Sequence, residues 1–285
     1  MQASMIGREL KHDSTLSPLA RAYCRLFGVP IIGLRIRWRW VRRHLPESAT
    51  QILDAGCGRG VISRALAACF PAARINAIDV DAERQVINAD IARAAGIQNC
   101  TFTTGDVLAL EDVDRYDFIV SVDNLEHVED DRGVMAGFFK ALQPGGTLLV
   151  HVPHYYRHWP VFQRVENFDV PGHVRPGYHA AELTERLGDA GFVVESVRFS
   201  YGWMETIANN LSYAITGAQE RNQILYALAF PWLNLIARLG HQRAPSFGAG
   251  LLAIARKPEQ GKKVVLEPVH LSDKSAEELN ALDET

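Results

Sequence analysis

Three acidic residues each follow a short apolar segment in the first half of the chain, and a glycine run lies beside the first. Asp54 comes near the end of QILDA, Asp79 ends RINAID, and Asp106 follows TTG. The carboxylate of Asp79 could accept hydrogen bonds from both hydroxyls of a ribose. The carboxylate of Asp106 could accept one from an adenine amine. Each acid alone could cap a helix or form a turn. In this order they predict a nucleoside-containing ligand.

The glycine run does not by itself identify that ligand. Gly56, Gly58 and Gly60 let the backbone approach a ligand closely, and Asp54 can orient the turn or bind an amine. The dinucleotide fingerprint G-x-G-x-x-G requires glycine at 61, where this chain has Val61. The spacing therefore weakens the case for a nicotinamide dinucleotide.

The elements that position these residues alternate between strand and helix patterns. Apolar strand segments occur at 51–55, 74–78, 100–104, 116–122 and 147–152, with helix-compatible segments at 61–70, 83–95 and 133–142. Such alternation predicts an α/β fold, a doubly wound, Rossmann-like, mostly parallel sheet with helices on both faces. Ligands of these sheets bind at the carboxyl ends of the strands, where the three acids lie.

The second half of the chain completes the sheet and adds an insertion. A helix at 180–190 and strands at 192–200 and 247–256 bring the sheet to seven strands. The segment 153–178 is rich in His, Tyr, Trp and Pro with little periodicity, so we expect a functional loop. Residues 201–246 form two apolar-faced helical patterns, which predict a helical cap over the carboxyl edge, with a homodimer interface or membrane contact as alternatives.

The segment from about 50 to 152 resembles the class I S-adenosylmethionine-dependent methyltransferases. The resemblance rests on LDAGCGRG, AIDVD, TTGDV, YDFIVSVDNLEHVED and ALQPGGTLLVHVP, and HVRPGYHAAELTERLGDAGF extends it. LEHVED is most similar to the branch that includes the ubiquinone-pathway enzymes. The resemblance implies a methionine site at Asp54, Gly56, Cys57, Gly58 and Gly60, a ribose site at Asp79, and an adenine site at Asp106 and Val107. We expect Val80, Gly105, Val122 and Asp123 to complete the contacts with S-adenosyl-L-methionine.

Methyl transfer from a sulfonium requires mainly alignment in a pocket with little water. A general base is needed only for a neutral acceptor such as a hydroxyl. His127 is the first candidate for this base and His154 the second, although either could instead orient or pack beside the cofactor. The predicted acceptor is a small or lipid-linked organic molecule, attacked at oxygen.

Candidate acceptor-binding residues lie mostly in the aromatic segment after the fifth strand. Its side chains could equally fold over one another, and the GHVRPGY segment could serve only as a hydrogen-bonded helix lead-in. The predicted substrate contacts are Tyr155, Tyr156, His158, His173, Arg175, Tyr178 and Trp203.

Charge and cysteine spacing exclude several classes of protein. A formal net charge of -3 argues against nucleic-acid binding. The four cysteines show no ligand-like spacing, so we expect no metal and reduced thiols in a cytoplasmic protein. The longest nearly apolar stretch, at 224–237, falls short of the roughly 20 residues of a membrane-spanning helix.

The chain ends differ in charge from the predicted core at 50–256. Residues 1–49 form a helical lead-in, whose stretch from Arg21 to Leu45 contains seven arginines and no acid. Its apolar stripe, Leu34, Trp38, Val41 and Leu45, predicts packing on the core, with peripheral membrane contact as the alternative. Residues 257–285 carry four lysines and seven acids, which predict a disordered tail.

Two other functions compete with methyl transfer. A nicotinamide-dependent dehydrogenase is disfavoured by Val61. A non-catalytic binding protein with the methyltransferase fold is disfavoured by the intact glycine turn and acid series, which such a protein would not need.

Overall fold

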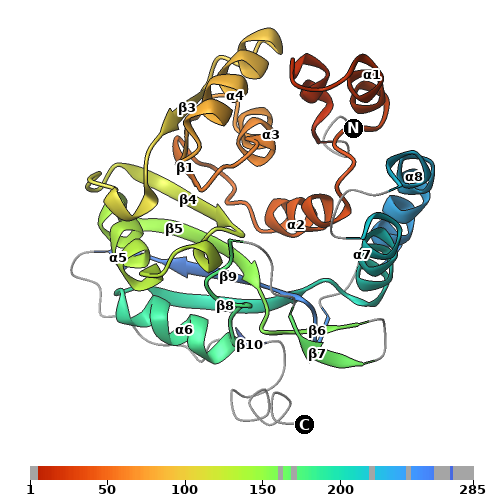
Figure 1. Ribbon diagram of the computed structural model, residues 1–285. Coiled ribbons are helices and arrows are strands. Elements are labelled where there is room, and N and C mark those ends of the chain that lie inside the picture. The colour runs from red at the N-terminus through yellow and green to blue at the C-terminus, as the bar shows by residue number, and fades with distance from the viewer. Residues whose placement is uncertain are drawn as a thin grey trace.

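Eight strands form one sheet at the centre of the molecule (Figure 1). The computed structural model describes residues 6–159, 163–167, 172–217, 222–241, 245–259 and 270–271. In spatial order the strands are β10 (His270–Leu271), β8 (Val193–Ser200), β9 (Gly250–Arg256), β5 (Leu142–Pro153), β4 (Tyr116–Val122), β1 (Gln51–Ala55), β2 (Arg74–Asp79) and β3 (Cys100–Thr104).

The sheet is mostly parallel, as the sequence predicts. Strand β9 is antiparallel to both of its neighbours, β5 and β8, and the remaining pairings are parallel. The seven predicted strands are confirmed, and the two-residue β10 adds an outer strand that the sequence did not reveal. Crossover helices between parallel strands place the carboxyl ends of β1, β2, β3 and β4 at one edge.

Helices cover both faces of the sheet (Figure 1). They are α1 (Pro18–Phe27), α2 (Ile32–Arg43), α3 (Val61–Cys69), α4 (Ala82–Ala94), α5 (Asp131–Ala141), α6 (Ala180–Asp189), α7 (Trp203–Thr216) and α8 (Gln223–Leu239). Three short 3-10 helices lie at Arg8–His12, Val107–Ala109 and Leu125–His127. No helix in the described part of the chain is long and apolar enough to cross a bilayer.

Two apolar cores lie on opposite faces of the sheet because successive strand residues point in opposite directions. In β1, Ile52 joins the core formed with α1, α2, α3, α4 and α8, whereas Leu53 joins the core formed with α5 and α6. Both faces of the central strands are therefore buried away from solvent, which explains the continuous apolar runs in the sequence.

The N-terminal segment packs into the first of these cores. Trp38 and Val41 of α2 are buried, and Leu34 and Leu45 pack against the same core, as their helical spacing predicts. Helices α7 and α8 lie beside α2 (Figure 1). The indole Nε1 of Trp40 donates to Glu205 of α7 at 2.9 Å. The lead-in and the insertion thus pack together as one helical layer.

The segment predicted as a loop at 153–178 contains a short hairpin. Strands β6 (Tyr156–His158) and β7 (Arg164–Glu166) pair in an antiparallel manner, so the prediction of a loop was wrong for these residues, and the predicted functional role is untested. Three-residue strands are too short to show an alternating apolar pattern. Most of the predicted tail, at 260–269 and 272–285, lies outside the described residues.

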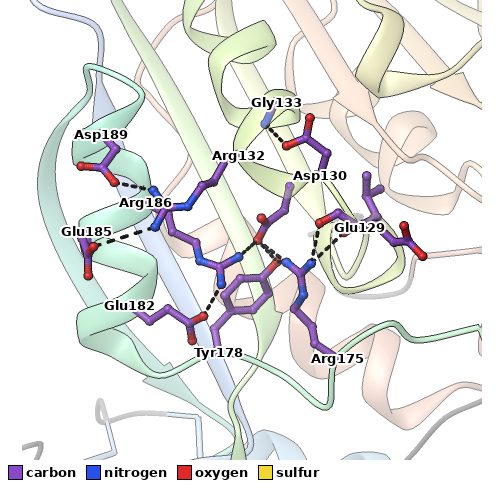
Figure 2. A network of polar contacts seen from close by, with 12 residues as sticks. Glu129, Asp130, Arg132, Gly133, Arg175, Tyr178, Glu182, Glu185, Arg186 and Asp189 are labelled. Carbon is purple, nitrogen blue, oxygen red and sulfur yellow. Dashed lines mark hydrogen bonds and ion pairs between the residues drawn. The ribbon is translucent and has the colours of Figure 1, made fainter.

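A buried carboxylate fixes the end of that segment to the second core. Asp131, the first residue of α5, accepts hydrogen bonds from Arg175, Arg186 and the hydroxyl of Tyr178, the last at 2.6 Å (Figure 2). Arg175 also donates to the carbonyls of Val128 and Glu129 at 3.0 and 2.9 Å. Burial, with Asp131 adjacent, raises the pKa of Tyr178. This network joins the segment that leads into α6 to the first residue of α5.

We expect Asp131→Asn to lower the free energy of unfolding by about 3 kcal/mol, because two guanidinium groups lose their shared carboxylate. Denaturant unfolding measures this. The matched control is Asp189→Asn, which removes a solvent-exposed partner of Arg132 and should lower it by less than about 1 kcal/mol. Equal effects of the two substitutions would contradict the structural role of Asp131.

Candidate active site

Two adjoining cavities lie at the carboxyl ends of the central strands, and Gly56 lines both. The larger, of about 300 Å³, is lined by Gly56, Asp79, Val80, Gly105, Asp106, Val107, Leu108, Asn124, His127, Val128 and Glu129. The smaller, of about 180 Å³, is lined by Leu34, Arg37, Asp54, Gly56, Cys57, Gly58, Arg59, Val61, Ile62, Val122 and Asp123. Eleven of the twelve predicted cofactor contacts therefore line one cavity or the other, and Gly60 lies next to them.

The glycine turn has a conformation that other residues adopt poorly. Gly56, Gly58 and Gly60 have φ of 76°, 48° and 64°. A Cβ at Gly56 would lie 2.2 Å from Cγ of Asn124, and one at Gly60 would lie 2.5 Å from the Phe102 ring. The amide groups of Gly56 and Cys57 both donate to the carbonyl of Ile78, at 2.9 and 3.0 Å. The turn is thereby held against β2 and leaves room for a ligand.

Asp79 is fixed by two backbone amides. Its Oδ2 accepts from the amide of Gly58 at 2.8 Å, and its Oδ1 accepts from the amide of Asp81 at 3.1 Å. A carboxylate has about four acceptor positions, so two are left for ligand hydroxyls. Asp106 lies across the same cavity, and its Oδ1 accepts from the amide of Leu108 at 2.9 Å, capping the short helix there. The capping and ligand-binding alternatives are compatible at this position.

Asp54 and Cys57 have altered acidity in the smaller cavity. Burial, with the neighbouring charge of Asp79, raises the pKa of Asp54 to about 6, although Ser63 donates a hydrogen bond to it at 2.6 Å. Burial also raises the pKa of Cys57, whose thiol donates to Gln85 at 3.3 Å. The thiol therefore stays protonated at neutral pH, which does not suit a nucleophile.

Asp123 connects the sheet to the N-terminal segment. Arg37 of α2 forms an ion pair with its Oδ2, and Nδ1 of His151 lies 2.6 Å from its Oδ1. Nε2 of His151 lies 2.8 Å from the hydroxyl of Ser200. Burial would raise the pKa of Asp123, but Arg37 and His151 outweigh it and lower the pKa to about 2. This carboxylate stays ionised, with φ of 49° in the left-handed region that functional sites often stabilise.

His127 occupies the rim of the larger cavity beside Glu126 and His173. Its Nδ1 lies 2.9 Å from the carbonyl of Gly172, so that nitrogen carries the proton and Nε2 is the basic one. The rings of His127 and His173 are 4.6 Å apart. Burial, with Asp123 nearby, raises the pKa of Glu126. The donor atoms of all three lie within 4.8 Å of one another and could hold a cation, a grouping that the sequence did not reveal.

The described lining of the two cavities includes none of the other predicted catalytic and substrate residues. His154 is fully buried, and its ring packs edge-on against the rings of Phe199 and Phe247, at 5.1 and 5.2 Å. His158 stacks on Trp203 at 5.3 Å. Tyr155 stacks on His179, next to Tyr156, and Arg175 and Tyr178 belong to the Asp131 network. Their roles toward an acceptor stay predictions.

Several residues at the cavities were not identified from the sequence. Among them are Arg37 and Arg59, which line the smaller cavity, and His151, which contacts Asp123 of that cavity. Arg37 is one of seven arginines between 21 and 45, and nothing local distinguishes it. Arg59 lies between Gly58 and Gly60, and no role was assigned to it from the sequence. His151 did carry a signal, because a histidine at a fully buried position of β5 requires a hydrogen-bonding partner.

Comparison with known proteins gives consistent results. A family model described as a methyltransferase domain matches residues 34–197. Trans-aconitate 2-methyltransferase of Streptomyces avermitilis is 32% identical over 149 residues, 51% of each chain. Ubiquinone biosynthesis O-methyltransferase of Azotobacter vinelandii is 29% identical over 115 residues, 40% of this chain and 49% of that protein. This chain thus spans about half the length of the curated relatives it matches.

The fold is also similar to solved structures. An S-adenosylmethionine-dependent methyltransferase from Mesorhizobium loti superposes with a TM-score of 0.55 at 22% identity, covering 79% of this chain and 99% of that one. At this identity the likeness establishes the arrangement of the sheet and helices and no more.

The raised pKa of Asp54 predicts a pH-dependent stability. Because the folded pKa of about 6 exceeds the unfolded value of 3.8, the protonated folded state is favoured. This contribution is complete below about pH 4 and is lost as the pH rises through about 6, a change of about 3 kcal/mol. The free energy of unfolding of Asp54→Asn, relative to that of wild type, should therefore rise by about 3 kcal/mol between pH 4 and pH 7.

Urea unfolding of both proteins at several pH values measures this difference, with exposed Asp90→Asn as the control. A constant difference between wild type and Asp54→Asn across the range would show that the Asp54 carboxyl titrates normally.

Proposed function

This chain belongs to the methyltransferase domain family, as a class I S-adenosylmethionine-dependent methyltransferase, and we propose that it transfers a methyl group from S-adenosylmethionine to oxygen of a small or lipid-linked organic acceptor. The observation that carries the proposal is the pair of cavities joined at Gly56, with a fixed carboxylate in each. The family resemblance inferred from the motifs is confirmed by the family match over 34–197.

The two cavities match the two parts of S-adenosylmethionine. The larger offers Asp79 to ribose hydroxyls and Asp106 to an adenine amine. The smaller offers Asp54 to a cationic group, and the raised pKa of Asp54 reports a buried carboxyl that a positive charge would stabilise. Gly56 lies where the two cavities meet, and any side chain there would collide with Asn124. The residues present therefore fit this cofactor.

The bound cofactor supplies an activated methyl group on a sulfonium, so the protein's task is alignment and exclusion of water. Leu34 and Arg37 of α2 line the smaller cavity and close it from the N-terminal side. The cap role predicted for residues 201–246 stays a prediction, since none of the described residues lining the two cavities belongs to α7 or α8.

His127 is the base that we propose for a hydroxyl acceptor. The carbonyl of Gly172 holds the proton on Nδ1, which leaves Nε2 as an acceptor at the edge of the larger cavity. His154 is less suited to this role, because its ring is enclosed by the aromatic side chains of Phe199 and Phe247.

The relatives suggest where to look for the acceptor. One is named for trans-aconitate and another for ubiquinone biosynthesis, so a panel of small carboxylic acids and phenols is the first choice. Formation of S-adenosylhomocysteine from S-adenosylmethionine measures turnover for each compound. No product with any acceptor, despite cofactor binding, would favour a non-catalytic binding protein.

Cofactor affinity should depend on Asp79. We expect S-adenosylhomocysteine to bind in the micromolar range and Asp79→Ala to bind at least about tenfold more weakly, because charge-assisted hydrogen bonds to the ribose contribute roughly 1.5–3 kcal/mol. Calorimetric titration measures this, with NAD as the competing ligand and exposed Asp90→Ala as the control. Unchanged affinity in folded Asp79→Ala, or tighter binding of NAD, would refute the assignment.

Turnover should depend on His127 more than binding does. If Nε2 takes the proton from the hydroxyl of the methyl acceptor, His127→Ala should lower kcat by about 10²–10⁴-fold with little change in cofactor affinity. His12→Ala serves as the control, since His12 does not line either cavity. A large loss of cofactor affinity with unchanged kcat would instead mean that His127 positions the cofactor.

A further inference from the structure

A cavity lined by positive charge lies between α2 and the end of α8, apart from the cofactor cavities. Its volume is about 460 Å³, and no acidic residue is among its described lining. The lining consists of Ile6, Arg35, Trp38, Arg39, Arg42, Arg43, Arg238 and His241. Five guanidinium groups around one cavity, in a chain with a net charge of -3, create a local site for anions.

The arginines at the base of this cavity are held in position. Arg35 donates from Nε to the carbonyl of Val29 at 2.9 Å, and its guanidinium lies over the ring of Phe230 at 4.8 Å. Glu205 lies 3.8 Å from Arg39 and 3.1 Å from Nδ1 of His241. One buried carboxylate of α7 thus contacts both Arg39 and His241 in the wall of the cavity.

The exposed face of α8 is apolar along its length. Ile224, Leu228 and Trp232 are 81%, 70% and 69% exposed, and Leu225, Leu235 and Leu239 are also exposed. At 3.6 residues per turn, these six side chains fall within an arc of about 100°. The opposite face, which includes Phe230, Leu233 and Ala237, is buried. Such a stripe of large exposed apolar residues is unusual on a protein surface that faces only water.

Neighbouring elements extend this apolar face. Tyr23 of α1 donates to the carbonyl of Ala227 in α8 at 2.6 Å, which fixes α1 beside α8. Leu19 and Leu26 lie on the same side of α1 as Tyr23, and both are exposed. Arg238 belongs to α8 and lines the cationic cavity, so the apolar face and the cavity adjoin.

We propose that this face docks on an anionic phospholipid bilayer, with α8 and α1 in the interface and a lipid phosphate in the arginine-lined cavity. Amphipathic helices bind at membrane surfaces through apolar burial together with attraction of basic residues to anionic lipids. A free phosphate or a nucleic acid would use the arginines and leave six apolar side chains in water. A two-fold dimer over this face would bring the five arginines of each copy into one interface, where their like charges would repel.

The docking face and the cofactor site share one helix. Arg37, which pairs with Asp123 in the smaller cofactor cavity, projects from the side of α2 opposite to Arg35 and Arg39. Helix α2 therefore has the proposed lipid site on one side and lines the smaller cofactor cavity with its other side.

The first experiment is co-sedimentation of the full chain with vesicles of phosphatidylcholine alone or with 30% phosphatidylglycerol, at about 0.1 M salt. We expect binding to the anionic vesicles at least about tenfold stronger, and weaker binding at higher salt. Equal binding to both vesicle types, or none to either, would overturn the proposal. So would stabilisation of the protein by inorganic phosphate without vesicle binding.

Matched variants separate the charged part from the apolar part. Arg42→Gln with Arg43→Gln should weaken binding about 30-fold, a factor of about five for each basic residue. The control, Arg74→Gln with Arg93→Gln, removes the same charge from exposed sites elsewhere. Equal losses in the two double variants would mean that net charge alone drives binding.

For the apolar part, Leu228→Gln with Trp232→Gln should reduce binding about tenfold or more, because both side chains leave the interface. Val86→Gln with Val113→Gln is the control, since these exposed valines lie outside this face. Analytical ultracentrifugation tests the alternative occupant. A wild-type dimer that Leu228→Gln with Trp232→Gln converts to a monomer, with vesicle binding unchanged, would assign the face to a second copy of the chain.

Discussion

The ion pair between Arg37 and Asp123 links the N-terminal helix to the carboxyl edge of the sheet. His151 supports the carboxylate from the opposite side, so Asp123 is charged and fixed although it is largely buried. Helix α2 takes its position from this contact together with its apolar stripe. Leu34 and Arg37 of this helix line the smaller cavity, and the helix also contacts α7 and α8. The wall of the smaller cavity thus includes a contact between residues 86 positions apart in the sequence.

Local features of the sequence were sufficient to predict the sheet and many of the residues that line the two cavities. The strands and the carboxyl-edge position follow from regular alternation. Asp79 ends β2, and the glycine turn comes directly after β1. Arg37 could not be predicted, because its partner lies on a different element and its neighbours in the sequence are also arginines. Long-range pairing depends on packing, which no local pattern encodes.

The segment after β5 shows the same limit from another side. Arg175 and Tyr178 have residue types that suit substrate binding, and their position after a strand supported that prediction. In the structure both contact Asp131, an acid at the start of α5 that the sequence did not connect to them. A buried carboxylate requires cationic or hydroxyl partners, so it recruits the same residue types that a substrate would. Residue type and strand position alone cannot separate these two uses.

The smaller cavity contains two carboxyl groups whose acidities shift in opposite directions. Asp123 has a pKa lowered to about 2 by Arg37 and His151, whereas the pKa of Asp54 is raised to about 6. The Arg37–Asp123 pair is neutral as a unit, which leaves Asp54 and Arg59 as opposite charges on the cavity wall. An amino acid moiety carries an ammonium and a carboxylate, so it complements both. An ammonium group bound next to Asp54 would lower the pKa of Asp54 again, and ligand binding should therefore release a proton near pH 6.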